Sequence, residues 1–438
     1  MIKKDGGSLS ILEQVNQFLW GFPLLALLAG AHLFFTVKLK FPQKYTLKAI
    51  RLSVTPEEGN GSGLSGFAAL ATTLAATLGT GNIIGVSTAV AVGGPGALFW
   101  CWITGILGMA TCYAECYLSV LFGVRKKGGT CVGGPMYVLE KGLHSRPLGM
   151  VYAACVILAA FGVGCTTQSS AITEAVHTVF PVSSHLIGIL AAVIAGLVIL
   201  GGVRSIGTFC SRMVPALGFF YIICCLYLLF LNRDVLLPSC SLILESALSP
   251  RAAAGGFIGS TVQSAARYGI ARGLFTNEAG IGTAAIAAAS SGTRDPRRQG
   301  LISMTAVFWD TVVMCAITGL VIISNILKNP ESITGYSSAS LTTAAFTFLP
   351  GGAAILSFSL VAFALTTLIG WCYYGERAAE YLFGGQSLVS YHLCYIVMIY
   401  IGAVLPMDLV WSVTDLINAL MVFPSCLALF ALQKKIRI

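Results

Sequence analysis

Apolar residues dominate the chain in long runs that short polar stretches separate. Eleven of these runs are long enough to cross a bilayer, because a spanning helix needs about 20 predominantly apolar residues. They cover, to within a few residues, 17–37, 65–93, 97–122, 149–176, 185–202, 212–231, 254–290, 300–326, 350–383, 389–405 and 408–432. The pattern predicts an all-α polytopic membrane protein with 11 transmembrane helices.

Two of these runs have features that a simple spanning helix avoids. The stretch from Ala71 to Gly96 has Gly79-Thr80-Gly81-Asn82 in its middle. Glycine lowers helix propensity, and an Asn at bilayer depth is costly unless its amide finds a partner. The run 254–290 is too long for one straight helix and contains the sequence GLFTNEAGIG at 273–282. We therefore expect two discontinuous helices, which in secondary transporters mark the binding site.

The composition agrees with a membrane protein and excludes a soluble enzyme. Of the 438 residues, 56% are hydrophobic and only 10% are charged, whereas soluble domains carry about 25% charged residues. The net charge of +9 does not indicate a nucleic-acid partner, because the positive residues lie in short loops between apolar runs. The 14 Cys are scattered without a CxxC pair, as expected of buried thiols that act as small hydrophobic residues.

Lys and Arg residues predict the orientation of the chain. Nineteen of the 26 lie in the connections on one side and in the C-terminal tail, and five lie on the other side. The positive-inside rule then places the N-terminus outside and the C-terminus in the cytoplasm of a protein in the plasma membrane.

The predicted segments divide into one helix followed by two sets of five. Each set opens with a Gly-interrupted helix, and five spans per set invert the second set relative to the first. We therefore predict an N-terminal helix with a cytoplasmic connection (1–64), a first inverted repeat (65–232), a second inverted repeat (233–432) and a cytoplasmic tail (433–438).

Five motifs resemble those of the alanine or glycine:cation symporter family, also called sodium:alanine symporters. They are GTGNIIGV (79–86), GGPGALFWCW (93–102), GGPMYVLE (133–140), RGLFTNEAGIG (272–282) and IGWCYYGERAAEYLFG (369–384). The resemblance implies the five-plus-five fold of the leucine-transporter type with one extra N-terminal helix. It also implies that sodium entry is coupled to uptake of alanine, and often of glycine or D-alanine. Cys101 departs mildly from the family pattern, in which many members have Met.

A cation site is predicted where the ninth segment faces the first break. Phe363, Thr366 and Thr367 stand at i, i+3 and i+4, so one helix face presents a carbonyl and two hydroxyls. The carbonyls of Ala75 and Leu78 would complete an oxygen shell for Na⁺, a spacing that resembles the sodium site of the wider fold. No carboxylate falls on this face within one turn, which favours Na⁺ over a proton. Alternatively, the two Thr hydroxyls bond only to carbonyls of their own helix.

The first break also predicts part of a substrate site. The backbone amides around Thr80, Gly81 and Asn82 open a half-helix whose dipole favours the carboxylate of an amino acid. Thr77, just before the break, is expected in the same site. Carbonyls near Gly273–Thr276, at the end of the other half-helix, suit the ammonium group.

Further substrate-binding candidates lie on three other segments. Gln168 is an amide at membrane depth that needs a partner, and Gly164, one turn earlier, would leave room beside it. Phe275 and Trp371 are expected to be aromatic walls that limit the substrate to a small side chain. The alternatives are helix–helix hydrogen bonding for Gln168 and ordinary packing for the two aromatic residues.

Several ionisable or polar residues fall within apolar runs and need an explanation. Asn277 and Glu278 follow Phe275 and Thr276 in the second break, and Thr276 and Asn277 are expected to bind the substrate. Glu278 could pair with Arg272 or Arg267 or bond to free amides of the broken helix, and we favour a structural ion pair or gate. Asp310 is a further buried carboxylate, and Glu115 is expected to reach the cytoplasmic surface. The cluster Glu376, Arg377 and Glu380 is interpreted as an exposed salt bridge.

These observations favour a sodium-coupled symporter for alanine, glycine or a similarly small neutral amino acid. A channel is disfavoured because no pore helix repeats and the polar groups concentrate at two breaks. A membrane-embedded enzyme is disfavoured because HExxH, paired Asp and GxSxG motifs are missing. The runner-up is a proton-coupled small amino-acid transporter in which Glu278 or Asp310 carries the proton.

Overall fold

Within the described residues, each apolar run that the sequence predicts to span coincides with a helix or a broken pair of helices. The computed structural model describes residues 11–55, 64–126, 131–248, 262–333, 337–405 and 408–438. Its helices are α1 (Ile11–Leu19), α2 (Phe22–Lys38), α3 (Thr46–Val54), α4 (Gly66–Thr77), α5 (Val86–Gly93), α6 (Gly96–Leu121), α7 (Pro135–Tyr137), α8 (Arg146–Ala159), α9 (Thr167–His177), α10 (Ser184–Ile199), α11 (Gly202–Leu231), α12 (Leu236–Leu248), α13 (Val262–Asn277), α14 (Thr283–Ala289), α15 (Pro296–Val307), α16 (Ala316–Lys328), α17 (Leu341–Phe346), α18 (Gly352–Phe383), α19 (Leu388–Val404) and α20 (Asp408–Ala431).

Three of the π-helical turns in the described residues belong to the spans: one begins the half-helix after the first break, and two join neighbouring helices. They are η2 (Gly81–Gly85) before α5, η4 (Ala160–Thr166) between α8 and α9, and η6 (Phe308–Cys315) between α15 and α16. Such turns are rare and occur often at functional sites. The only strands in the described residues are β1 (Val124–Arg125) and β2 (Cys131–Val132), which pair antiparallel.

Length and apolarity identify this fold as a polytopic membrane protein. Within the described ranges, seven helices are long and apolar enough to cross a membrane, and two bent pairs qualify if each counts as one span. The predicted span 185–202 corresponds to α10, which is apolar but has only 16 residues. The predicted span 254–290 corresponds to α13 and α14, and its first residues lie outside the described ranges. Large apolar side chains such as Leu197, Phe219 and Val397 are exposed, as lipid-facing positions require.

The first broken helix is interrupted over fewer residues than the sequence predicts. The helix α4 ends at Thr77, Leu78 and Gly79 are non-helical, and the continuation Gly81–Gly93 is bent by 54° from α4. The side chain of Asn82 stabilises this bend, because its Oδ1 accepts a hydrogen bond from the Gly79 amide at 3.0 Å. Ala75, expected in the unwound stretch, belongs to the last turn of α4, where carbonyls lack partners within the helix.

The second broken helix is interrupted later than predicted. The helix α13 ends at Asn277, so the carbonyls of residues 274–276 lie in its last turn, where carbonyls lack partners within the helix, and Gly273 lies just before that turn. A Cβ on Gly273 would lie 1.9 Å from the Thr104 hydroxyl of α6. This glycine therefore permits close helix packing rather than a break. The interruption covers Glu278–Gly282, where Glu278, Gly280 and Gly282 all have positive φ.

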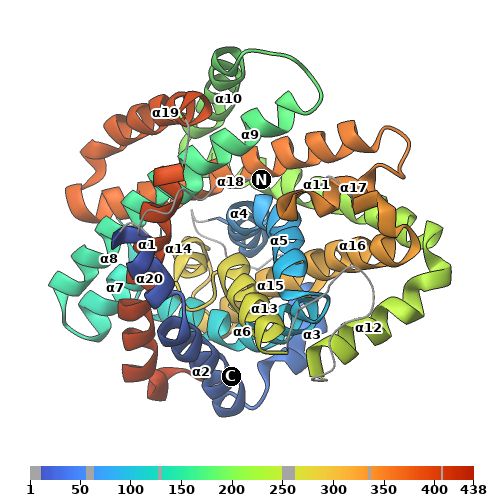
Figure 1. The fold of residues 1–438 in the computed structure, drawn as a ribbon. Coiled ribbons are helices and arrows are strands. Elements are labelled where there is room, and N and C mark those ends of the chain that lie inside the picture. Colours follow the sequence, from blue (N-terminus) through green and yellow to red (C-terminus); the bar gives the residue numbers. More distant parts are fainter. Residues whose placement is uncertain (1–10, 56–63, 127–130, 249–261, 334–336, 406–407) are drawn as a thin grey trace.

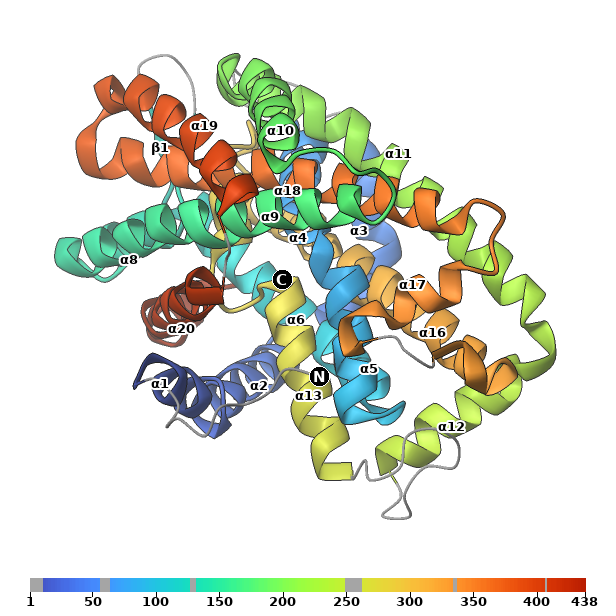
Figure 2. The same cartoon turned by 45° about the horizontal axis from the view of Figure 1, so that its top comes forward.

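The two broken helices lie side by side at the centre of the molecule (Figure 1). At one end they are joined directly, because the Leu64 amide donates to the Ser290 carbonyl at 3.0 Å and the Gly292 amide donates to the Leu64 carbonyl at 2.8 Å. The helix α6 packs against α13 and α15, and α18 packs against α4, α9 and α11. The N-terminal helices α1 and α2 lie beside α20 and α13 (Figure 2).

Candidate substrate and cation site

A cavity of about 500 Å³ lies where the two breaks meet. Its wall is formed by the bend between α4 and α5, by α9, by α13 and by Thr367 and Trp371 of α18. A volume of this size is within the range of small-molecule sites. Seven of the ten residues predicted to bind the substrate line it: Thr77, Thr80, Gly81, Gln168, Phe275, Thr276 and Trp371.

The cavity extends from the breaks toward the side that the charge pattern assigns to the outside. It follows α5 to Thr88 and Ala89, α9 to Glu174, and α13 back to Tyr268. At the opposite side, the hydrogen bonds between Leu64 and residues 290–292 hold α4 against the end of α14. The arrangement is that of a site open toward the predicted outer side.

The groups predicted to bind a cation are close together. The Thr367 hydroxyl is 3.2 Å from the Leu78 carbonyl, across the gap between α18 and α4, and 2.9 Å from the Phe363 carbonyl. The Thr366 hydroxyl is 2.8 Å from the same Phe363 carbonyl. Both Thr residues thus make the bonds to their own helix that the alternative interpretation requires, but Thr367 also reaches α4. Ala75 lies in the part of α4 that packs against Gly370, one turn along α18.

Gln168 presents a free acceptor to the cavity. Its Nε2 donates to the Val163 carbonyl at 3.2 Å, whereas its buried Oε1 has no hydrogen-bond partner among the described residues. A buried acceptor without a partner costs free energy, so a bound donor such as an ammonium group would be stabilised there. A Cβ on Gly79 would lie 3.8 Å from this oxygen and 2.8 Å from the Thr367 hydroxyl. A side chain at position 79 would therefore contact both groups.

Gly164 has a different role from the one predicted. A Cβ at this position would lie 2.1 Å from the Cβ of Trp371. The missing side chain thus makes room for Trp371 to pack against η4, rather than for a ligand beside Gln168. Trp371 itself is 1% exposed and lines the cavity, so its position depends on Gly164.

Asn82 faces away from the cavity. Its Nδ2 donates to the Asp310 carboxylate at 2.7 Å and to the Asp310 carbonyl at 3.1 Å, while its Oδ1 caps Gly79. Thr311 donates to the other carboxylate oxygen of Asp310 at 2.7 Å. These contacts join the first break to η6. The predicted contribution of Asn82 to a substrate site can come from its backbone only.

Asn277 and Glu278 also hold the backbone of a break. The Asn277 Oδ1 accepts a hydrogen bond from the Ala279 amide at 3.0 Å, which ends α13. The Glu278 carboxylate accepts one from the Thr283 hydroxyl at 2.6 Å, across the interruption. Among the described residues Glu278 forms no ion pair with Arg272 or Arg267, in contrast to the prediction, although it does line the cavity.

Arg272 is a component of the site that the sequence analysis named only as a partner for Glu278. Its Nη2 donates to the Gly81 carbonyl at 2.6 Å, so it connects α13 to the first break. A Cβ on Gly85 would lie 1.3 Å from that Nη2, which means that Gly85 leaves the space the guanidinium occupies. An Arg in an apolar run is a functional candidate by default, and this signal could have identified it.

Two further lining residues come from helices that the sequence analysis had not connected with the site. Trp20 lies between α1 and α2, and Asp415 lies in α20. Nothing in the spacing of residues 17–37 relates this segment to the breaks. Only the packing of α1 and α2 beside α13 and α20 brings it to the cavity (Figure 2).

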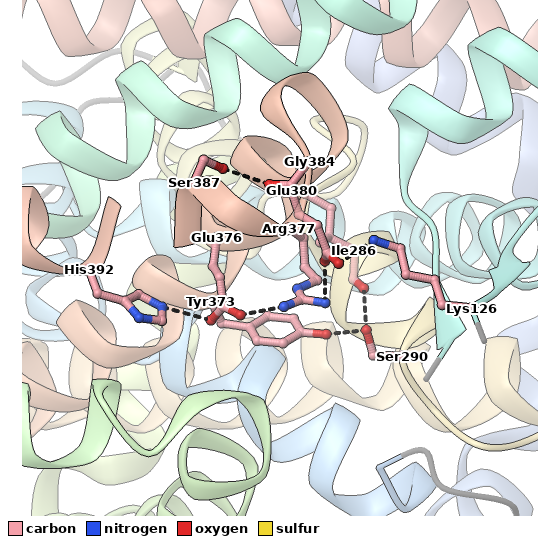
Figure 3. A network of polar contacts seen from close by, with 10 residues as sticks. All are labelled: Lys126, Ile286, Ser290, Tyr373, Glu376, Arg377, Glu380, Gly384, Ser387 and His392. Carbon is pink, nitrogen blue, oxygen red and sulfur yellow. Dashed lines mark hydrogen bonds and ion pairs between the residues drawn. The ribbon is translucent and has the colours of Figure 1, made fainter. Parts of the chain in front are cut away.

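The cluster of Glu376, Arg377 and Glu380 is buried, not exposed as predicted. The Glu376 and Arg377 side chains are 2% and 7% exposed, and Arg377 pairs with both Glu376 and Glu380. Figure 3 shows that Lys126, His392 and the Tyr373–Ser290 hydrogen bond extend this network. The prediction was wrong because α14, α19 and the segment that contains Lys126 cover this part of α18. The network contacts the same end of α14 that bonds Leu64.

Glu115 likewise does not reach the surface. Its side chain is 4% exposed, accepts a hydrogen bond from the Ser425 hydroxyl at 3.1 Å and contacts the Gly280 backbone amide. It therefore joins α6 and α20 to the second break.

Comparison with known proteins identifies the family. The family model described as the sodium:alanine symporter family matches residues 7–437. The chain belongs to this family. It is therefore a multi-pass membrane transporter of the group that couples small amino acids to sodium or protons, and it is not an enzyme.

Two of the curated relatives of this family member are named for alanine. It is 41% identical over 432 residues to the sodium/alanine symporter AgcS of Methanococcus maripaludis, covering 97% of this chain and 94% of the relative. It is 31% identical over 443 residues to the putative sodium/proton-dependent alanine carrier protein YrbD of Bacillus subtilis, covering 97% and 90%.

Solved structures support the fold alone, because their sequence identities to this family member are low. A Na⁺-coupled sialic acid symporter in a substrate-bound outward-open state has a TM-score of 0.61 at 13% identity, and the match covers 94% of this chain and 87% of that one. MhsT in complex with L-phenylalanine has a TM-score of 0.57 at 14% identity, covering 85% and 90%. The predicted fold class, of the leucine-transporter type with broken helices, is confirmed.

Proposed function

We propose that this protein imports alanine, glycine or a similarly small neutral amino acid across the plasma membrane, together with Na⁺, by alternating access. The observation that supports this most directly is the free Oε1 of Gln168 at the edge of the cavity, beside the bend between α4 and α5. An α-amino acid offers an ammonium group to that oxygen. Its carboxylate would take the amides of Thr80 and Gly81, which begin the half-helix and lack partners within it.

Na⁺ would bind behind this substrate site. Leu78, Phe363, Thr366 and Thr367 supply two carbonyls and two hydroxyls that three hydrogen bonds connect, and Ala75 is the fifth predicted ligand. Oxygen groups of this kind suit a hard cation. Because Thr367 and Leu78 come from different helices, a bound ion would hold α4 against α18. That contact would order the first break before the substrate arrives.

Proton coupling is the alternative, and two observations keep it open. Glu278 and Asp310 are buried carboxylates close to the breaks, and the relative YrbD is named for sodium or proton dependence. The two mechanisms differ in what drives uptake. A sodium symporter loses uptake when the sodium gradient is removed, and a proton symporter loses it when the pH gradient is removed.

Transport by purified protein in liposomes tests the proposal. Labelled alanine, glycine and D-alanine are offered with an inward Na⁺ gradient, with choline in its place, and with a proton ionophore. We expect saturable accumulation that requires Na⁺ and survives the ionophore. Uptake that persists without Na⁺ and collapses with the ionophore would favour the proton alternative, and single-channel currents would contradict a carrier altogether.

The orientation and the repeats belong to the same proposal. With the N-terminus outside and the C-terminal residues 433–438 in the cytoplasm, the cavity opens to the outside and the buried cluster around Arg377 closes the inner side. Residues 65–232 and 233–432 would be the two inverted repeats, and each contains one of the broken helices. Accessibility of single cysteines placed in the tail and near Thr88 to an impermeant thiol reagent tests this orientation.

A further inference from the structure

Trp20 of the N-terminal segment is held at the cavity by contacts at both ends of its indole. Its Nε1 donates a hydrogen bond to the Asp415 carbonyl of α20 at 2.9 Å. Its ring meets Phe275 of α13 edge to face, with centroids 6.1 Å apart and planes at 63°. Indoles bonded at the N–H and packed against another ring have little freedom to move. The side chain is therefore a fixed part of the wall, although α1 and α2 lie outside both predicted repeats.

The contacts of Trp20 continue to the first break. Phe275 lies beside the Arg272 guanidinium, with 5.3 Å between the guanidinium carbon and the ring centroid. Arg272 in turn donates to the Gly81 carbonyl at 2.6 Å. Trp20 thus buttresses the aromatic ring that faces the substrate site, and lines the cavity itself. A smaller residue at position 20 would enlarge the cavity at this wall. It would also let the Phe275 ring move, and both changes would affect substrate binding.

The breaks alone do not restrict the substrate to a small side chain. The cavity of about 500 Å³ is large enough for ligands much bigger than alanine. Four aromatic residues line it, namely Trp20, Tyr268, Phe275 and Trp371. Trp371 is fixed by its packing against Gly164, and Phe275 is fixed on one side by Arg272. The remaining side of Phe275 is the one that Trp20 occupies.

We propose that Trp20 is a specificity-determining residue, which sets the largest amino-acid side chain that the site accepts. This inference rests on the proposed function, because it concerns the size of a neutral amino-acid substrate. Its physical basis is that an apolar wall discriminates by excluded volume. In such a pocket, one extra or missing methylene group changes the discrimination between two substrates by about 10- to 200-fold.

Competition binding to purified full-length protein tests the inference without requiring transport. Labelled alanine is bound in the presence of Na⁺ and displaced by glycine, alanine, 2-aminobutyrate, valine and leucine. For Trp20→Ala we expect the affinities for leucine and valine to rise at least about tenfold relative to the affinity for alanine. Trp20→Phe, which keeps a ring but loses the bond to Asp415, should be intermediate.

A matched tryptophan provides the control. Trp102 of α6 also donates its Nε1 to a backbone carbonyl of another element, that of Val312 at 3.2 Å, and does not line the cavity. Trp102→Ala should keep the wild-type order of competitors. If Trp20→Ala kept the wild-type order of competing amino acids, the inference would be overturned. A folded Trp20→Ala protein that binds no alanine while Trp20→Phe keeps the wild-type order would also overturn it. Wild-type protein that binds none of these amino acids would overturn the proposed function, and this inference with it.

Discussion

Side chains at the two breaks divide into those that face the cavity and those that hold the backbone. Gln168 and Thr367 line the cavity, and Gln168 offers an acceptor that no described residue uses. Asn82 and Asn277 instead cap amides of the interrupted helices. Both kinds are polar residues in apolar runs, so the sequence alone treats them alike. The distinction predicts different consequences for their removal.

The Thr367 hydroxyl should matter for the apparent affinity for Na⁺. Thr367→Val keeps the shape of the side chain but removes the oxygen that connects Phe363 to Leu78. We expect the Na⁺ concentration for half-maximal alanine uptake to rise about tenfold, which corresponds to about 1.4 kcal/mol. Thr305→Val is the matched control, because Thr305 is buried and donates to the carbonyl of Ile302 in its own helix. Equal Na⁺ dependence in both variants would rule out the predicted site at Thr367.

Two substitutions of Asp310 test whether this residue positions Asn82 or carries a proton. Asp310→Asn keeps an oxygen that can accept from the Asn82 amide, whereas Asp310→Ala removes the 2.7 Å acceptor and leaves that amide only its longer contacts to the carbonyl of residue 310 and to the Cys315 sulfur. Na⁺-driven uptake in liposomes should therefore stay within about threefold of wild type for Asp310→Asn and fall at least tenfold for Asp310→Ala. If the two variants were equally inactive, the charge itself would be required, which would favour the proton-coupled alternative.

At the scale of elements, glycines allow the broken helices and their neighbours to pack closely. Gly85 accommodates the Arg272 guanidinium, and Gly164 accommodates Trp371. Gly273, which the sequence suggested as a breaking residue, lets α13 approach α6. The same residue type thus serves a break at Gly79 and close packing elsewhere.

Gly85→Ala tests the contact between α13 and the first break. The added methyl group would overlap the guanidinium of Arg272, so the bond from Arg272 to Gly81 should be lost. We expect alanine binding to weaken by about tenfold, in line with loss of a charge-assisted hydrogen bond. Gly218→Ala is the control, because nothing lies within 4 Å of a Cβ at that position. Alanine binding that is equally strong in both variants would show that this contact does not support the site.

The buried cluster around Arg377 should contribute strongly to stability. Removing one partner of a buried ion pair leaves an uncompensated charge and costs about 3–5 kcal/mol. Arg377→Ala should therefore lower the thermal unfolding midpoint in detergent. Lys328→Ala removes the partner of Asp234 from an exposed pair, which is worth at most about 1 kcal/mol. Similar midpoints for the two variants would contradict a strong contribution of the Arg377 cluster to stability.

At the scale of the whole molecule, the spans and the interruptions could be predicted from the sequence. Apolar runs mark the spans because backbone groups in lipid must bond within the segment. The Gly-Thr-Gly-Asn stretch marked the first break to within two residues. The second break was placed early because a glycine that permits packing looks like a glycine that permits a bend.

Contacts between distant segments could not be predicted in this way. Trp20, Arg272 and Asp415 meet at the cavity only because α1, α2, α13 and α20 pack together. The burial of Arg377 likewise depends on which segments cover α18. The periodicity and spacing of residues along a single helix do not show which distant segments pack together. The division into inverted repeats also depends on how distant segments are arranged, and it remains a prediction.

The account depends on Na⁺ and substrate binding to the same broken helix. The most direct measurement is equilibrium binding of labelled alanine to the purified protein at increasing Na⁺, with choline keeping the ionic strength constant. Shared use of the α4–α5 bend predicts that Na⁺ raises the affinity for alanine by about 5- to 150-fold. An affinity for alanine that is the same with and without Na⁺ would contradict it.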